Sequence, residues 1–555
     1  MNFKMKTRFL ALAAALVCCY SCIETNYTLG GSLVPTVETY TFHTVDIPLE
    51  GISMQMADNL SGYSDSRVTI GAIREPEYGL TTRASSVTLV PLFMDKLDMG
   101  KDPVFKRFHF SIGRDTTCFL NANQENILQR VHVYALDEPV DPSVDYDVNR
   151  PIAHGTKSIT IGDPVYNGLD SLTFDFSEEF AKKYLQITQD DLKDMKTYLA
   201  KFPGIYLETE VPSSDGGRID MFDVQMGYDA NSGYITGNFA TLSYSAEFSG
   251  KRKDTTVVFW YGATDFYDLD SLFDAYSGSF PQYALNYTGQ ETRDRVGDAH
   301  DKIWIEGGGG LKPVVSALSL KRQVEQAVIQ AGGNPKDAVI NKATLIFPFD
   351  FPADYRDMDR YWPYRLSPTC RLVNEDESAT YMGLTDASSS YENQGDVDRS
   401  LLRYAPDITY HMQEILKIDE SATDKATTKN LLAGNYDIWL LVMAQEILTT
   451  VSTTSKETQE MYQYLAYQSY YNGMYGGYGY GGYGGYGGYG SGYGSYYNNY
   501  LTYAMLAQQA SQARTSTSTT IELDTDRFYC ASLHGPEAAG KVPTLRLIFA
   551  LPNQE

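Results

Sequence analysis

The sequence has little cysteine and histidine for its length. Six cysteines and seven histidines are spread over 555 residues. If a leader ending at residue 21 is removed, four widely separated cysteines remain, which does not make a disulfide framework: Cys22, Cys118, Cys370 and Cys530. No two histidines have the His-x-x-x-His spacing of a zinc site. The composition therefore argues against a disulfide-stapled scaffold and supplies no metal-ligand motif.

The usual catalytic motifs are also missing. The sequence has no Gly-x-x-x-x-Gly-Lys-Ser/Thr phosphate loop and no Gly-x-Ser-x-Gly nucleophile elbow. Residues 479–484 match a dinucleotide fingerprint by composition, but they lie in a low-complexity tract rather than between a strand and a helix. We therefore predict no cofactor apart from a covalent lipid, and no nucleotide site.

Two further shortages concern partners. No segment after the leader offers eighteen consecutive apolar residues, so no spanning helix is expected. Acidic residues outnumber basic ones by 70 to 45, which gives a net charge of −25. Because this charge repels phosphate groups, nucleic acid and anionic lipid headgroups are poor partners.

The first 21 residues have the three zones of a secretory signal peptide. Three basic residues precede the apolar run 9–17, and Ser21 stands directly before Cys22. A small residue before cysteine favours cleavage followed by attachment of a fatty acid such as palmitate to Cys22. Cys19 and Tyr20 differ from the usual lipobox, so an ordinary secretory signal cut nearby remains the alternative.

The residues after the predicted cleavage site bear on location. Ile23 follows Cys22 where an inner-membrane retention signal of well-studied export routes has Asp. We therefore expect an outer-membrane lipoprotein, on either the periplasmic or the surface face. Residues 22–35 read as a tether to the folded chain.

Period-two alternation of apolar residues predicts a mainly β chain. Phe108, Phe110 and Ile112 fall on one face of a predicted strand. The runs 242–248 and 257–261 predict a hairpin whose tip carries three basic residues, 251–253.

Helices are predicted to be few and short. Ser177 can cap a helix that runs to about residue 183, and Thr188 with Asp191 forms a capping-box pattern for a second. A third has apolar residues at helical spacing over 324–331 and ends at the following glycines.

A similar order of elements occurs twice. Residues 174–185 and 405–416 each combine an extended piece, a capping hydroxyl and a short amphipathic helix, and an apolar strand follows each. We interpret this as a duplication of jelly-roll-like β-sandwich domains, 36–262 and 263–555, with short plugging helices. Chance similarity of short units is the alternative.

Residues 451–518 depart from that pattern. Helices are predicted over 454–470 and 501–514, on either side of a Gly/Tyr tract. We interpret the segment as a helical hairpin inserted between two strands of the second domain. Its tyrosines offer aromatic contact surface to a partner, whereas a flexible spacer is the alternative; the candidates are Tyr478, Tyr483, Tyr486 and Tyr489.

Residues 407–409, the short amphipathic helix after them and the apolar strand 435–442 follow one another in an order that resembles bacterial jelly-roll modules, in which a short helix plugs one end of the sandwich. A second resemblance is carried by the stretches 67–71, 77–80, 133–136, 145–146, 304–310, 340–343 and 407–409. On these stretches the chain is similar to a family of Bacteroidota outer-membrane lipoproteins that is catalogued only as a domain of unknown function. The resemblance implies a β-sandwich lipoprotein and transfers no catalytic residue.

Two groups of residues are candidates for ligand sites. Asp265, Asp268 and Asp270 could bind calcium through carboxylate oxygens, but the favoured explanation is that they stabilise a helix N-terminus. The four glycines 307–310 predict a bulge or tight bend rather than a phosphate cradle.

Three functions remain open from the sequence. The leading hypothesis is a non-enzymatic accessory subunit of an outer-membrane assembly, export or uptake complex. A glycan-binding lipoprotein is the alternative, in which Trp362 and Trp439 would stack on sugar rings instead of filling a core. A glycoside hydrolase needs two opposed carboxylates, and nothing in the sequence selects a pair.

Overall fold

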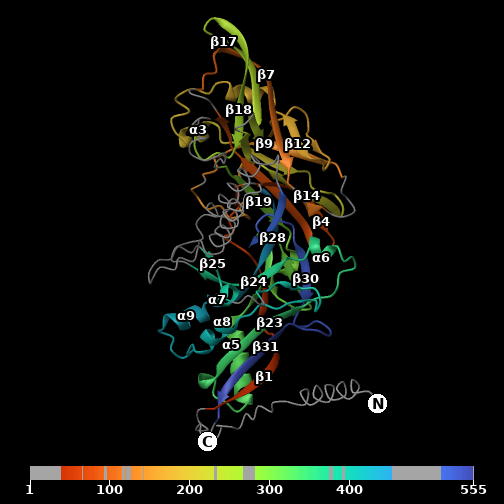
Figure 1. Cartoon of the computed structure of the whole chain (residues 1–555), viewed down its shortest axis with the longest axis vertical. Helices are drawn as coiled ribbons and strands as arrows, with labels where there is room; N and C mark the ends of the chain where they lie inside the picture. Colours follow the sequence, from red (N-terminus) through yellow and green to blue (C-terminus); the bar gives the residue numbers. More distant parts are fainter. Residues whose placement is uncertain are drawn as a thin grey trace, which may run out of the picture.

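The computed structural model describes residues 39–553 except 66, 93–96, 116–118, 121–126, 142, 230–233, 267–281, 374–378, 390–393 and 453–513. Within this part, the protein is mainly β, and every strand pairing is antiparallel. The prediction of a β-sandwich-rich chain with short helices is confirmed. Figure 1 shows an elongated molecule, whose two hydrophobic cores we call the upper body and the lower body.

The upper body is built on a fifteen-stranded sheet. Its main path is β10 (His154–Ser158), β9 (Gln129–Leu136), β13 (Ile205–Thr209), β5 (Gly79–Val87), β4 (Arg67–Glu75), β14 (Gly216–Asp223), β7 (Lys101–Arg114), β17 (Ala240–Phe248), β18 (Lys251–Tyr261) and β6 (Leu89–Leu92). Joined to it are β3 (Tyr63–Ser64), β8 (Phe119–Leu120), β11 (Val165–Tyr166), β12 (Ser171–Asp175) and β19 (Ala284–Gln290), and a separate pair is formed by β15 (Met226–Asp229) and β16 (Tyr234–Gly237).

The lower body has two larger sheets and one strand pair. The seven-stranded sheet contains β20 (Gly297–Asp298), β2 (Ile52–Met56), β22 (Leu311–Val315), β28 (Ile438–Ser452), β24 (Arg365–Val373), β25 (Ala379–Gly383) and β29 (Arg514–Leu523). The five-stranded sheet runs β1 (Tyr40–Pro48), β31 (Thr544–Pro552), β23 (Val339–Pro348), β27 (Arg403–Tyr404) and β26 (Val397–Asp398). The pair is β21 (Lys302–Glu306) with β30 (Cys530–His534).

The upper core follows the alternation seen in the sequence. Phe108, Phe110 and Ile112 on β7 are all fully buried. Phe110 stacks on Phe174 of the paired strand β12 with ring centroids 4.5 Å apart. Because successive strand residues point to opposite faces, the intervening positions of β7 remain partly exposed.

The helices are short; one predicted start is confirmed and another is corrected. Ser177 caps α2 (Glu178–Tyr184) as predicted, by accepting a hydrogen bond from the N–H of Phe180. Thr188 and Asp191 do bond to each other, but they form a turn, and α3 (Met195–Lys201) begins after the cap Asp194. The other described helices are α5 (Ala317–Gln330), α6 (Asp357–Arg360), α7 (Thr385–Ser389), α8 (Thr409–Leu416), α9 (Ala426–Leu432), η3 (Arg293–Arg295) and η4 (Pro335–Asp337).

The hairpin at the top of Figure 1 has a tighter turn than the sequence predicts. Strands β17 and β18 are joined by Ser249 and Gly250, whose φ angles are 51° and 77°. Two positive φ values are the signature of a type I′ turn, which matches the twist of the paired strands. The basic residues 251–253 therefore lie in β18 rather than in the loop.

The strand pairing does not follow the predicted division at residue 262. Strands β1 and β2 pair with β31 and β22, so the first described residues belong to the lower body. Strand β19, beyond residue 262, pairs with β5 of the upper body. The upper body is therefore inserted into the lower one, because the chain enters it after β2 and returns after β19.

The two predicted repeat units are alike only locally. In both, a backbone N–H just before the helix donates to a neighbouring strand: that of Phe176 to the carbonyl of Phe108, and that of Ile408 to the carbonyl of Ala343. The following strands differ, since β13 pairs with β9 while β28 pairs with β22 and β24 in another sheet. The two units therefore differ in which strands pair with the strand after the helix, and a short sequence motif does not determine this pairing.

The predicted insertion does lie between two paired strands in the sequence, β28 and β29. Residues 443–452 of β28 pair with residues 514–523 of β29 in continuous register, and we call this two-stranded element the ribbon. The strands include residues 451–452 and 514–518, which the sequence analysis assigned to the insertion. The predicted helices and the Gly/Tyr tract lie outside the described residues, apart from Arg514, which is the first residue of β29 and not part of a helix.

Candidate functional site

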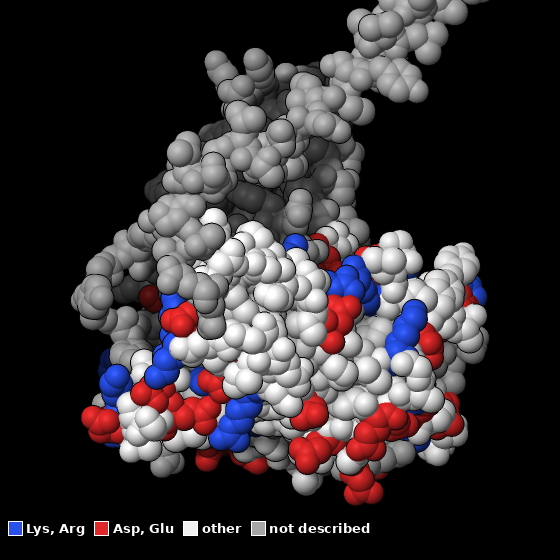
Figure 2. Space-filling model, turned by 90° about the horizontal axis from the view of Figure 1, so that it is seen from below, with Lys and Arg blue, Asp and Glu red and all other residues white. Residues whose placement is uncertain are grey.

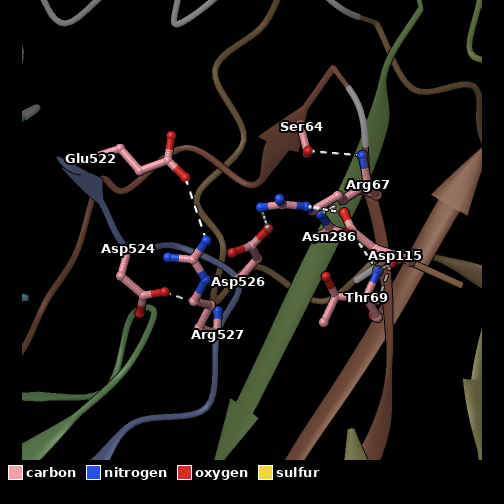
Figure 3. Close-up of polar contacts among 10 residues, drawn as sticks. Ser64, Arg67, Thr69, Asp115, Asn286, Glu522, Asp524, Asp526 and Arg527 are labelled. Carbon is pink, nitrogen blue, oxygen red and sulfur yellow. Dashed lines mark hydrogen bonds and ion pairs between the residues drawn. The ribbon is translucent and has the colours of Figure 1, made fainter. Parts of the chain in front are cut away.

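Buried and partly buried charged side chains gather where the upper and lower bodies meet. We call this group the junction cluster; part of it is shown in Figure 3. It contains cations and carboxylates in equal number. They come from β4, β5, β21, β22, the short helix η3, the end of β29 and the residues that directly follow β7 and β29. Its members are Arg67, Arg83, Asp115, Arg295, Glu306, Lys312, Glu522, Asp524, Asp526 and Arg527.

The upper body contributes two arginines. Arg67 on β4 donates through Nε to Asp115 at 2.7 Å, and its Nη1 lies 3.9 Å from Asp526 of the lower body. Arg83 on β5 is 1% exposed and donates through Nη2 to the carbonyl of Arg527 at 2.6 Å. Both arginines therefore link the upper body to the segment that follows β29.

That segment, residues 524–527, forms a turn held by its own first side chain. One carboxylate oxygen of Asp524 accepts the N–H of Arg527 at 2.9 Å, and the other accepts the N–H of Gly308 at 2.8 Å. The guanidinium of Arg527 lies 3.8 Å from Glu522, near the end of β29. The N–H of Asp524 donates to the carbonyl of Val442 on β28, so the turn also closes the base of the ribbon.

The four glycines join β21 to β22 and surround a cation. Nζ of Lys312 donates to the carbonyls of Glu306, Gly308 and Gly310 at 2.5, 2.8 and 3.0 Å. The stretch is thus a tight turn, as predicted, and its carbonyls point at positive charge. A phosphate cradle has the opposite polarity, because there the N–H groups converge on an anion.

Neighbouring side chains explain the need for glycine. A Cβ at Gly309 would lie 2.2 Å from the amide of Asn149, which donates to the carbonyl of Gly309 itself. A Cβ at Gly310 would lie 2.4 Å from the amide of Gln290. Asn149 and Gln290 belong to the upper-body chain, so the turn is packed between the two bodies.

Burial shifts the pKa values of the cluster. Burial raises the pKa of Asp526 to about 6, although Arg67 opposes this shift. Burial lowers the pKa of Lys312 to about 8, against the attraction of Asp524 and Glu306. At neutral pH both groups are charged, and each faces opposite charge. The arrangement suits a lock between the two bodies better than proton transfer, since its carboxylates are occupied by cations and backbone N–H groups.

The predicted site residues are not brought together. Trp439 is 5% exposed and packs edge-on against Tyr381, so its ring fills a core and the predicted sugar contact is wrong for this residue. Trp362 is partly exposed and packs against Phe349. Asp265 is exposed, and no metal-binding group of carboxylates, histidines or cysteines occurs among the described residues. Outside these residues lie Cys22, Asp268, Asp270, Tyr478, Tyr483, Tyr486 and Tyr489.

Sequence reasoning missed the junction cluster. One signal was present: Arg83 and Lys312 stand within runs of otherwise uncharged strand residues, where a charge is costly unless it is paired. The partners are up to 444 residues away along the chain, so no local pattern identifies them.

Comparison of the chain with family models, curated proteins and solved structures finds no match. None of the helices in the described part of the chain is long and apolar enough to cross a membrane.

Proposed function

We propose that the protein is a non-enzymatic lipoprotein of the outer membrane and an interaction subunit of an assembly, export or uptake complex. The observation that carries the proposal is the ribbon, which leads to the Tyr/Gly-rich insertion and is fixed at its base by the junction cluster. In this proposal the two bodies form a scaffold, and the insertion contacts a protein partner.

The cluster supports a scaffold because it ties the ribbon to both bodies at once. The turn after β29 bonds to β28 through Asp524, to the upper body through the carbonyl of Arg527, and to the glycine turn through the N–H of Gly308. Ion pairs and hydrogen bonds in so buried a site are costly to break singly. The two strands from which the insertion departs are therefore held to both bodies at their base.

Replacing residues 453–513 by a two-residue Asn-Gly turn tests the partner contact. The ten paired positions of the ribbon remain, so we expect the fold to be kept and the melting temperature not to fall. Loop-closure free energy grows by about 0.6 kcal/mol per doubling of loop length, so the shorter loop favours the folded state. Cross-linking and affinity capture from cells at matched expression should lose partners that the full-length chain retains. An identical partner list would make the insertion a spacer, and loss of folding would make it part of the lower body.

Lipid attachment is tested separately. Cells fed a clickable fatty acid should label the wild-type protein and leave the Cys22→Ala variant unlabelled, whereas equal labelling of both would refute the lipid anchor. Protease treatment of intact and of permeabilised cells then distinguishes the surface face from the periplasmic face.

Glycan binding remains a second candidate, supported by the partly exposed ring of Trp362 alone. Glycan-array binding that is lost on Trp362→Ala and kept on Tyr355→Ala, which removes an exposed ring elsewhere, would favour it. A hydrolase has less support, because the buried carboxylates described above are paired with cations.

A further inference from the structure

The lower end of the molecule carries exposed aromatic side chains on its five-stranded sheet. Tyr40 and Phe42 on the edge strand β1 are 50% and 65% exposed. Phe42 lies opposite Ala550 of β31, which in turn lies opposite Val339 of β23, so these side chains share one face. Tyr40 lies opposite Pro552 on the same face. We call this set the end patch.

The end patch is apolar. Charged residues lie further along the same face, and one of them is Lys342 of β23, which lies opposite Ile548. Further along the same face, Asp46 and Arg546 form two hydrogen bonds of 2.9 Å and neutralise each other. Figure 2, which views the molecule from below, shows uncharged residues over the middle of this end, with acidic and basic side chains around them. The opposite face of the sheet is the lower core, where Leu545, Leu547 and Phe549 are buried.

The predicted anchor enters the fold at the same end. Strand β1 begins and β31 ends at the bottom of Figure 1. Sixteen residues, 23–38, separate Cys22 from Thr39, and a chain of this length spans at most about 60 Å. A lipid on Cys22 therefore holds the end patch within reach of the bilayer without forcing contact, so the chemistry of the end decides whether it docks.

We propose that the end patch docks on the headgroup region of a neutral phospholipid bilayer, an inference that rests on the proposed lipoprotein function. Tyrosine and phenylalanine are suited to this region, because their rings enter the apolar boundary while the tyrosine hydroxyl stays hydrated. The net charge of −25 disfavours an anionic surface. Docking would make the long axis of the molecule point away from the membrane surface, so that the β17–β18 hairpin is the part farthest from the membrane.

Vesicle flotation of the unlipidated chain tests the patch apart from the anchor. The protein is residues 22–555 with Cys22→Ala, and the probe is phosphatidylcholine vesicles. The test variant adds Tyr40→Asp and Phe42→Asp. The control adds Phe351→Asp and Tyr355→Asp, which change rings that are 57% and 70% exposed elsewhere on the lower body.

We expect the test variant to lower the partition coefficient at least about tenfold, since two rings lose their apolar contact, and the control to stay within about twofold. Adding phosphatidylglycerol to the vesicles should weaken partition of the parent chain. Absence of partition at millimolar lipid, or equal loss in both variants, would overturn the proposal. A second test pair, Tyr40→Ser with Phe42→Ser, gives the same comparison if the aspartates unfold β1.

The two proposals fail in different ways. Fatty-acid labelling of Cys22 without vesicle partition would leave the lipoprotein in place and remove the docking surface. Partition without labelling would leave the docking surface and remove the anchor.

Discussion

Replacing Lys312 by methionine should destabilise the junction more than any other single change in the glycine turn. The substitution keeps an unbranched side chain of similar length but removes the ammonium that serves three buried carbonyls. A buried acceptor left without a donor costs about 1–3 kcal/mol, and removing one partner of a buried charge group costs about 3–5 kcal/mol. Because methionine avoids the desolvation of an ammonium, we expect a net loss of about 3–5 kcal/mol.

Urea denaturation followed by tryptophan fluorescence measures this loss, since Trp304 lies on β21 next to the turn. The matched control is Lys429→Met on helix α9, where the lysine is exposed and a change within about 0.5 kcal/mol is expected. Equal denaturation midpoints for the wild type and Lys312→Met would refute the cation-centred interpretation of the turn. A loss of the same size in the control would show that methionine itself, rather than the missing ammonium, is responsible.

Three further changes test other parts of the structure. Burial raises the pKa of Asp526 to about 6, above its ordinary 3.8, so the folded state holds this proton more tightly. The stability of the wild type should therefore fall by about 2 kcal/mol as the pH rises from 4 to 6. Urea midpoints of Asp526→Asn should lack this fall, and parallel pH profiles of the two proteins would contradict the prediction. Gly309→Ala should cost about 1–3 kcal/mol in the same assay, because its Cβ would displace the Asn149 amide, and an unchanged midpoint would mean that the amide moves freely. Asp386→Ala should lower the melting temperature, because the carboxylate of Asp386 caps α8 by accepting the N–H groups of Tyr410 and His411. The loss of this cap should cost about 1–2 kcal/mol. Amide exchange in the first turn of α8 that is as slow as in the wild type would refute this role.

The sequence predicts features that depend on near neighbours. Alternation of apolar residues predicts the buried face of β7, and Ser177 predicts the start of α2, because both depend on residues a few positions apart. The capping pair Thr188 and Asp191 shows the limit of this reasoning. Its hydrogen bonds form, yet the chain turns there and the helix begins later, at Met195.

The tertiary structure alone decides the junction cluster and the division into bodies. Arg83 and Arg527, whose carbonyl it binds, are 444 residues apart, and the sequence around neither residue predicts this contact. In the same way, β1 pairs with β31 although they stand near opposite ends of the chain. Hydrophobic periodicity predicts that a strand has a buried face, but it does not identify the partner, because any other strand with the same alternation can pair with it. The partner is chosen by the packing of the whole chain, and with it the site where buried charges meet.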